Sequence, residues 1–325
     1  MPIAISRTAP FRHLQKQIGS ATYRLNTILV GLEAIADGAS SPSRLPVTWP
    51  KPSSPGQARN VADQASIFAC TSALVPAADI FDQFLGSLAV EDWLGFSPEA
   101  RDIATKAITR PKGKGGAYSV AERTTELLKD LKLPISPAVG GLDLLSNWRN
   151  VAVHTKKRAI SLGKGMAQLL LDEKDHFEKH YSHFDIDLAL KNFYGRKNPV
   201  PKEATSLIAV VQNTSRALDE AAIKRVAGTP DLIMNVTDKL LREYFTDGER
   251  DIPGSTEVAE AWQGSKERRL ANFLKILQKV GVTDTSSVVS AVLPQDYITD
   301  VIGYTRSEFE SRFLKQDDPE RLTIV

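Results

Sequence analysis

Apolar side chains recur at the spacing of an α-helix along nearly the whole chain, and this periodicity constrains the fold more than any other feature. They lie three or four residues apart in one segment after another, whereas the alternating pattern of a β-strand is nowhere sustained. Helices are expected over 9–37, 58–88, 97–109, 120–131, 142–155, 166–181, 203–226, 231–245, 256–279 and 286–315. The sequence therefore predicts an all-α protein.

Segments rich in proline, serine and glycine separate the predicted helices. Residues 39–57 are dominated by Ser and Pro, which predicts an irregular connector, and 110–117 form a basic, glycine-rich loop. The Gly140-Gly141 pair is expected to break the chain before the next helix. A later Gly-Thr-Pro break suggests a helical domain over 1–228 and a C-terminal helical region over 229–325, and no repeat of fixed period is visible.

The composition is that of an ordinary globular chain of 325 residues, with 25% charged and 42% hydrophobic residues, which excludes disorder and collagen. Lys+Arg 41 against Asp+Glu 39 leaves a formal charge of +2, so the average does not indicate a nucleic-acid binder. The one cysteine, Cys70, excludes an internal disulfide and a thiolate metal site, which suits a reducing cytoplasm.

The N-terminal residues 1–17 lack the continuous apolar core of a signal peptide, so we expect a mature start and a cytoplasmic protein. The apolar runs, such as 207–211, are far shorter than the roughly 20 residues that cross a bilayer. No membrane span is expected.

The segment 142–154 carries the most informative pattern. A turn of about 100° per residue puts five apolar side chains on one arc: Leu144, Leu145, Trp148, Val151 and Ala152. The opposite side carries Asp143, Asn147, Asn150 and His154, at spacings of four, three and four, with Arg149 beside them.

An amide, an imidazole and a guanidinium on one ridge suit recognition of a phosphodiester. The guanidinium is a planar fork of donors for phosphate oxygens, and the imidazole can give and take a proton near neutral pH. RNA supplies its own 2′-OH as a nucleophile, so proton transfer and charge neutralisation suffice without a metal. The alternative interpretation is an amphipathic helix whose polar face carries Arg and His without any chemistry.

The order Arg149-Asn150-Val-Ala-Val-His154 resembles the R-x4-6-H motif of the HEPN superfamily, the all-helical nucleotide-binding and ribonuclease domains, including the polar residue directly after the Arg. Two long helices precede the motif helix in that family, as expected here over 9–37 and 58–88. The loose resemblance covers about residues 10–226, the motif itself covers six residues, and the resemblance does not extend to 227–325. The fold expected is therefore a HEPN-like helical bundle with an additional C-terminal helical region.

The resemblance implies a metal-independent endoribonuclease in which two protomers form one composite site. By position, Arg149 stabilises the phosphorane, Asn150 orients the site and His154 acts as general acid or base. The products are a 2′,3′-cyclic phosphate and a 5′-hydroxyl, and no cofactor is required. Many relatives act in toxin–antitoxin or phage-defence systems on transfer RNA or other cellular RNA, which implies an RNA substrate and a regulatory protein partner.

Position 156 is Lys, so the R-x4-H-x-Y pattern of toxins neutralised by adenylylation is not matched.

Basic side chains gather beside the motif. Residues 149–165 carry +5 and residues 101–118 carry +4, so the rest of the chain sums to −7. Phosphate contacts by such side chains hold a polyanion in a salt-dependent way. The RNA-binding candidates are Lys156, Lys157, Arg158, Lys164, Arg110, Lys112 and Lys114. A solvated lysine loop is the alternative interpretation.

Two other functions stay open. One is a non-catalytic helical module, antitoxin-like or a scaffold. The other is a metal-dependent hydrolase built on His176, His180 and His183, with Asp185 or Asp187 to complete a site, although the His-Glu-x-x-His order is absent.

Several further side chains carry expectations. Asp79 and Asp82 on the second long helix are candidates to position Arg149 or His154. Trp93, Trp148 and Trp262 are expected in the core or an interface, Cys70 is expected to be a buried small hydrophobe, and Tyr118 could stack on a base.

Overall fold

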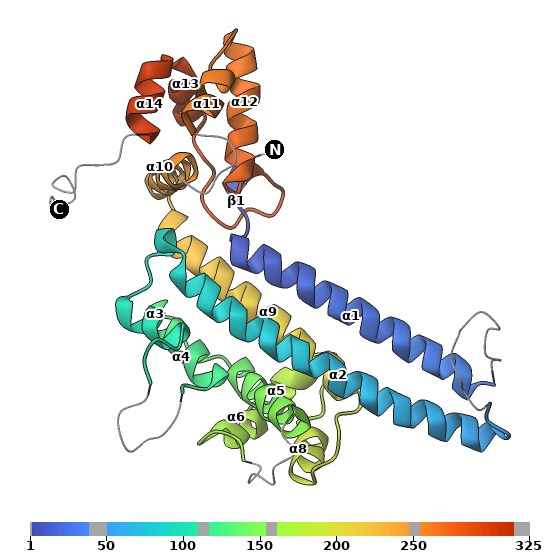
Figure 1. The fold of residues 1–325 in the computed structure, drawn as a ribbon. Coiled ribbons are helices and arrows are strands. Elements are labelled where there is room, and N and C mark those ends of the chain that lie inside the picture. Colours follow the sequence, from blue (N-terminus) through green and yellow to red (C-terminus); the bar gives the residue numbers. More distant parts are fainter. Residues whose placement is uncertain (1, 39–50, 110–116, 154–160, 247–253, 315–325) are drawn as a thin grey trace. The chain divides into compact units, whose positions relative to one another are not determined.

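The protein is predominantly helical in the computed structural model, which describes residues 2–38, 51–109, 117–153, 161–246 and 254–314 (Figure 1). Within these ranges the elements are β1 (Ile3–Ile5), α1 (Ala9–Ala36), α2 (Pro55–Val90), the 3-10 turn η1 (Asp92–Leu94), α3 (Pro98–Ala104), α4 (Val120–Asp130), α5 (Ala138–Val153), α6 (Met166–Asp172), α7 (Lys174–His180), α8 (Ile186–Tyr194), α9 (Pro201–Ala227), α10 (Pro230–Thr246), α11 (Gly254–Ala261), α12 (Lys266–Lys279), β2 (Val282–Asp284), α13 (Gln295–Gly303) and α14 (Arg306–Phe313).

The chain divides into two compact units. The large unit comprises Pro10–Val90 and Phe96–Leu218, and the small unit comprises Met1–Ala9, Glu91–Gly95 and Asp219–Val325. The sequence places a boundary at 228/229, ten residues beyond the point inside α9 where these units meet. It also assigns Met1–Ala9 and Glu91–Gly95 to the first domain, because nothing in their local sequence marks a contact with residues more than a hundred positions away.

The large unit is organised around α1 and α2, which pack antiparallel (Figure 1). Near one end of the pair, the rings of Phe11 and Phe84 meet edge to face at 6.3 Å. Near the other end, Arg59 forms an ion pair with Glu33 at 2.8 Å. Helices α3, α4 and α5 pack on α2 as well, so α2 is the central helix of the unit.

Helix α5 begins earlier than the sequence predicts, because the Gly140-Gly141 pair lies inside the helix instead of breaking it. These glycines are sites of close packing. A Cβ on Gly140 would lie 2.9 Å from Leu170 Cγ, and one on Gly141 would lie 3.2 Å from Val210 Cγ1. Hydrogen as a side chain lets α6 and α9 approach the backbone of α5, and this tertiary contact outweighs the weak helix propensity of glycine.

Three predicted helices are each divided in the structure. The segment 166–181 forms α6 and α7, and 256–279 forms α11 and α12. Gly264 has φ +93°, and the next residue, Ser265, caps α12 by accepting from the Arg268 N–H. In the described part of 286–315 only α13 and α14 are helical, and α8 was not predicted. The helical spacing of apolar residues continues across these breaks, because the helices before and after each break bury their apolar faces in the same core. The breaks are therefore not visible in the spacing.

The small unit contains a two-stranded antiparallel sheet, which the sequence did not predict. Ile3 in β1 lies opposite Asp284 in β2, and Ile5 lies opposite Val282. Three-residue strands are too short for an alternating pattern. A polar cluster ties the helices of this unit together, because the Asp238 carboxylate accepts hydrogen bonds of 2.6 Å from both the Tyr297 hydroxyl and Arg312 Nη2.

Among the described residues, helix α2 is long and apolar enough to cross a membrane by length and composition. Half of its most apolar stretch is buried against other parts of the protein, and the core helices of water-soluble proteins meet the same criterion. The expectation that no segment spans a membrane stays a prediction.

Candidate functional site

Helix α5 presents the candidate site because its apolar face is held in the core of the large unit. Leu144, Leu145 and Trp148 are buried, as the sequence predicts. The Trp148 indole N–H donates to the carbonyl oxygen of Lys197 at 3.0 Å, and its ring meets Phe193 edge to face. These contacts set the rotation of the helix about its axis and turn the side chain of Arg149 toward α2.

The C-terminal end of α5 emerges from the core at this point. Asn150, Val151, Ala152 and Val153 are all exposed. The apolar arc expected from the sequence is therefore buried only as far as Trp148, and Val151 and Ala152 continue it on the exposed end of the helix. Two valines next to Arg149 are left accessible, with 38% of Val151 and 45% of Val153 exposed.

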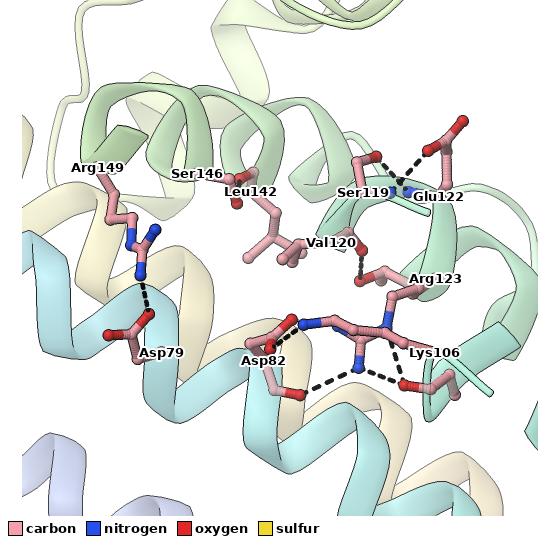
Figure 2. Close-up of polar contacts among 12 residues, drawn as sticks. Asp79, Asp82, Lys106, Ser119, Val120, Glu122, Arg123, Leu142, Ser146 and Arg149 are labelled. Carbon is pink, nitrogen blue, oxygen red and sulfur yellow. Dashed lines mark hydrogen bonds and ion pairs between the residues drawn. The ribbon is translucent and has the colours of Figure 1, made fainter. Parts of the chain in front are cut away.

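The Arg149 guanidinium is held from two sides. Its Nη2 lies 2.9 Å from Asp79 Oδ1 on α2, and its Nη1 donates to Asn150 Oδ1 at 3.2 Å (Figure 2). Its Nε is buried and has no hydrogen-bond acceptor among the described residues. Of the two acids expected to face Arg149 or His154, Asp79 thus contacts Arg149 directly, and 28% of the Arg149 side chain stays exposed.

Asp82 serves a different arginine, one that the sequence pattern did not single out. Its carboxylate accepts from the Arg123 guanidinium of α4 and from Lys106 Nζ, the latter at 2.6 Å (Figure 2). Arg123 also donates to the carbonyl oxygen of Ala104 at the C-terminus of α3, and its side chain is only 2% exposed. Burial lowers the pKa of Arg123, and Asp82 opposes this shift. The cluster joins α2, α3 and α4, and only its position in the fold reveals it.

The polar side chains expected along one side of α5 differ in exposure: some form hydrogen bonds within the fold, and another is exposed to solvent. Asp143 is buried, and its carboxylate accepts the Gly163 N–H at 2.7 Å, which ties the chain beyond the motif back to the helix. Burial raises the pKa of Asp143, and the hydrogen bond from Gly163 lowers it. Asn147 donates to the carbonyl oxygen of Asp143 in its own helix. Asn150 is the ridge residue that lies exposed beside Arg149.

Most of the predicted RNA-binding side chains lie outside the described residues, as does His154. The binding candidates concerned are Lys156, Lys157, Arg158, Arg110, Lys112 and Lys114. Lys164 is described and exposed, and it lies next to Gly163, which bonds Asp143. Tyr118, the candidate for base stacking, is half-buried.

The histidine cluster does not form a metal site in the described part of the chain, where no group of three His, Cys, Asp or Glu side chains is placed to hold an ion. The rings of His176 and His180 stack with their centroids 4.6 Å apart. His183 lies beyond the end of α7, in a left-handed backbone conformation with φ +59°. That turn separates it from the other two, so the helical spacing on which the metal interpretation depended does not hold.

The remaining expectations concern the core, and they are confirmed. Trp93, Trp148 and Trp262 are buried. Cys70 is fully buried in α2, where burial raises the pKa of its thiol to about 11. A thiol in such surroundings is not a nucleophile near neutral pH.

Comparison with protein-family models, with curated proteins and with solved structures found no match for this chain. The site is therefore interpreted from its own chemistry. Its accessible groups are a guanidinium held by a carboxylate and an adjacent amide, and the guanidinium suits an oxyanion as ligand.

Proposed function

We propose that the protein is a metal-independent endoribonuclease of HEPN type. Arg149 binds and stabilises the phosphorane, His154 acts as general acid or base, and Asn150 orients the site. The 2′-OH of the substrate attacks its own phosphate, the bond to the 5′-oxygen breaks, and the products carry a 2′,3′-cyclic phosphate and a 5′-hydroxyl. No metal or cofactor takes part.

One observation carries the proposal. The Arg149 guanidinium lies partly exposed at the emerging end of α5, between Asp79 and Asn150, in the turns that lead to His154. An arginine fixed by two partners and still accessible can meet a phosphate with little loss of conformational entropy. The all-helical frame, with two long helices before the motif helix, agrees with the family that the motif resembles.

A homodimer with a composite site follows from the same interpretation. Val151 and Val153 extend the exposed surface of α5 next to Arg149, and apolar side chains in that place favour contact with a second copy. Two copies would then contribute two arginines and two histidines to one site. We place the protein in the cytoplasm, as a toxin or phage-defence effector that cuts transfer RNA or another cellular RNA under the control of a partner protein.

The direct test uses purified wild type, Arg149→Ala and His154→Ala on total RNA and on transfer RNA. Each substitution should reduce cleavage by at least about 100-fold, the scale typical for loss of one acid–base or oxyanion group. The new 5′ ends should accept phosphate from a polynucleotide kinase without prior phosphatase treatment. Cleavage should persist in EDTA.

Matched controls are Arg24→Ala and His13→Ala, which remove the same residue types from exposed positions on α1. Both should cut like the wild type and unfold at the same temperature. Loss of cleavage in EDTA, or full activity in Arg149→Ala, would contradict the mechanism.

The Arg149–Asp79 ion pair also favours a second candidate, a non-catalytic binding module that keeps this fold. An arginine whose charge is balanced by a carboxylate can serve packing alone. In that case the wild type binds RNA or a partner protein, no RNA is cut, and Arg149→Ala and His154→Ala leave binding unchanged.

A further inference from the structure

Asp79 lies on the side of α2 that faces α5. It lies in the middle of α2, directly after the buried Ala77 and Ala78 and two residues before the buried Phe81. Its carboxylate points to Arg149 of α5, and 47% of the side chain is exposed. The other acid of this region, Asp82, lies one turn further along α2 and takes a different arginine (Figure 2).

The two contacts of the Arg149 guanidinium determine its plane. Asp79 accepts from Nη2 and Asn150 accepts from Nη1, so both ends of the fork are held. An arginine carries five N–H donors, two on each Nη, and one hydrogen on each Nη remains after these bonds. These remaining hydrogens can donate to the oxygens of a phosphate.

The two partners differ in what their loss would do. Asn150 is the next residue along the chain, so it cannot by itself hold the long side chain of Arg149 against α2. Asp79 comes from another helix, 70 residues away, and supplies the opposite charge. Without that charge the guanidinium is free to turn out into solvent, because several rotatable bonds connect it to the backbone.

We infer that Asp79 is a positioning residue of the proposed ribonuclease site, which acts on the phosphate through Arg149 and does not itself touch the substrate. This inference rests on the proposed function. It predicts that the carboxylate raises the turnover rate by presenting the guanidinium in the orientation of the transition state, and leaves the affinity for RNA nearly unchanged.

The test compares Asp79→Asn, Asp79→Glu and wild type in steady-state cleavage of one RNA substrate. Asp79→Asn should lower kcat by about 10- to 100-fold, because a small misplacement of a transition-state contact has an effect of this size. KM should stay within about twofold of wild type. Asp79→Glu keeps the charge and should recover part of the loss. Asp63→Asn, an exposed acid on the same helix, is the matched control and should have no effect.

A double variant separates positioning from a general effect on the fold. Arg149→Lys keeps a charge but not the fork, so Asp79→Asn should add little to its loss of activity. If Asp79→Asn lowers activity equally in both backgrounds, Asp79 does not act through Arg149 and the inference is overturned.

Other outcomes also decide the question. Wild-type or increased cleavage by Asp79→Asn would show that the carboxylate is dispensable or competes with phosphate, and a change in KM alone would show that it acts on affinity. Either result overturns the inference. If Arg149→Ala and His154→Ala still cut RNA, the proposed function fails first, whatever Asp79 does.

Discussion

At the scale of single residues, two arginines that pair with acids on the same helix differ in how far their side chains are exposed. Arg123 and Arg149 each pair with an acid on α2, at Asp82 and Asp79. The Arg123 side chain is 2% exposed and its donors are taken by Asp82 and by a helix carbonyl, so it joins helices. Arg149 is 28% exposed and keeps donors for a ligand. The same pairing therefore buries one arginine between helices and leaves the other accessible, as the proposed function requires.

The buried carboxyl group of Asp143 is expected to make the stability of the fold depend on pH. Burial raises the pKa of Asp143 above its usual value of 3.8, so the folded protein holds this proton more tightly than the unfolded chain does. The tighter proton binding by Asp143 adds to the free energy of unfolding at pH values below 3.8, and this contribution is lost as the pH rises through the folded-state pKa of Asp143. Asp143→Asn removes this titration and keeps an oxygen for the Gly163 N–H.

Chemical denaturation of wild type and Asp143→Asn at a series of pH values from about 4 to 7 checks this prediction. The free energy of unfolding of Asp143→Asn, relative to that of the wild type, should increase as the pH rises through the folded-state pKa of Asp143 and should then level off. A relative stability that decreases with pH would mean that hydrogen bonds to the carboxylate outweigh its burial. Asp63→Asn, at an exposed site, should show no such trend.

At the scale of the elements, the position of the motif helix depends on how closely its neighbours approach. Helix α5 contacts α2 through its polar edge at Arg149, and α6 and α9 through the two glycines near its start. Its apolar face ends at Trp148, one residue before the site. A shift of α5 along its axis would therefore move Arg149 away from Asp79.

Alanine substitutions of glycine test this close packing. Gly140→Ala places a methyl group 2.9 Å from Leu170 Cγ, so α6 must shift, and we expect a loss of about 1–3 kcal/mol in the free energy of unfolding. The gain in helix propensity opposes the loss without removing it. Gly31→Ala on α1 is the control, because among the described residues only its chain neighbours and the nearby backbone of its own helix lie within 4 Å of the place its methyl group would take, and it should stabilise the protein by about 0.5–1 kcal/mol.

Thermal or urea unfolding of the two variants gives both values. Equal stabilisation by Gly140→Ala and Gly31→Ala would mean that α6 is not held against α5. Cleavage by Gly140→Ala should fall together with its stability, because the same contact supports the position of Arg149.

At the scale of the whole molecule, the near-neutral chain consists of two units of opposite charge. The large unit has 26 basic and 18 acidic residues, a net +8, and the small unit has 15 basic and 21 acidic residues, a net −6. The candidate site and both basic segments belong to the large unit. A polyanion is therefore expected to bind that unit in a salt-dependent way.

Lys164 offers a test of that expectation at a described position. Lys164→Ala should weaken RNA binding and reduce the slope of log affinity against log salt by about one, the change expected for loss of one phosphate contact. Lys266→Ala, an exposed lysine on α12 of the small unit, is the matched control and should leave the slope unchanged. Binding measured by fluorescence anisotropy at several salt concentrations distinguishes the two. Equal effects of both substitutions would contradict a preference for the large unit.

Local sequence patterns were enough to predict the helical class, the ranges of α1, α2, α4, α9 and α10, the burial of Trp148, and the motif that singles out Arg149. Helical hydrogen bonds join residues four positions apart. The 3.6-residue period of the apolar face can therefore be recognised from the order of the residues. Local capping and breaking signals act over the same short range, which is why these elements could be predicted without coordinates.

Which distant residues contact one another could be learned from the fold alone. In the fold, Arg149 pairs with Asp79 and not with Asp82, and Arg123 is buried. Strand β1 pairs with β2 from the other end of the sequence, and Gly140 and Gly141 lie inside a helix. Each of these outcomes depends on packing between elements that are far apart in sequence. Long-range contacts arise from the shape and charge of whole faces, and no local pattern of residues encodes them.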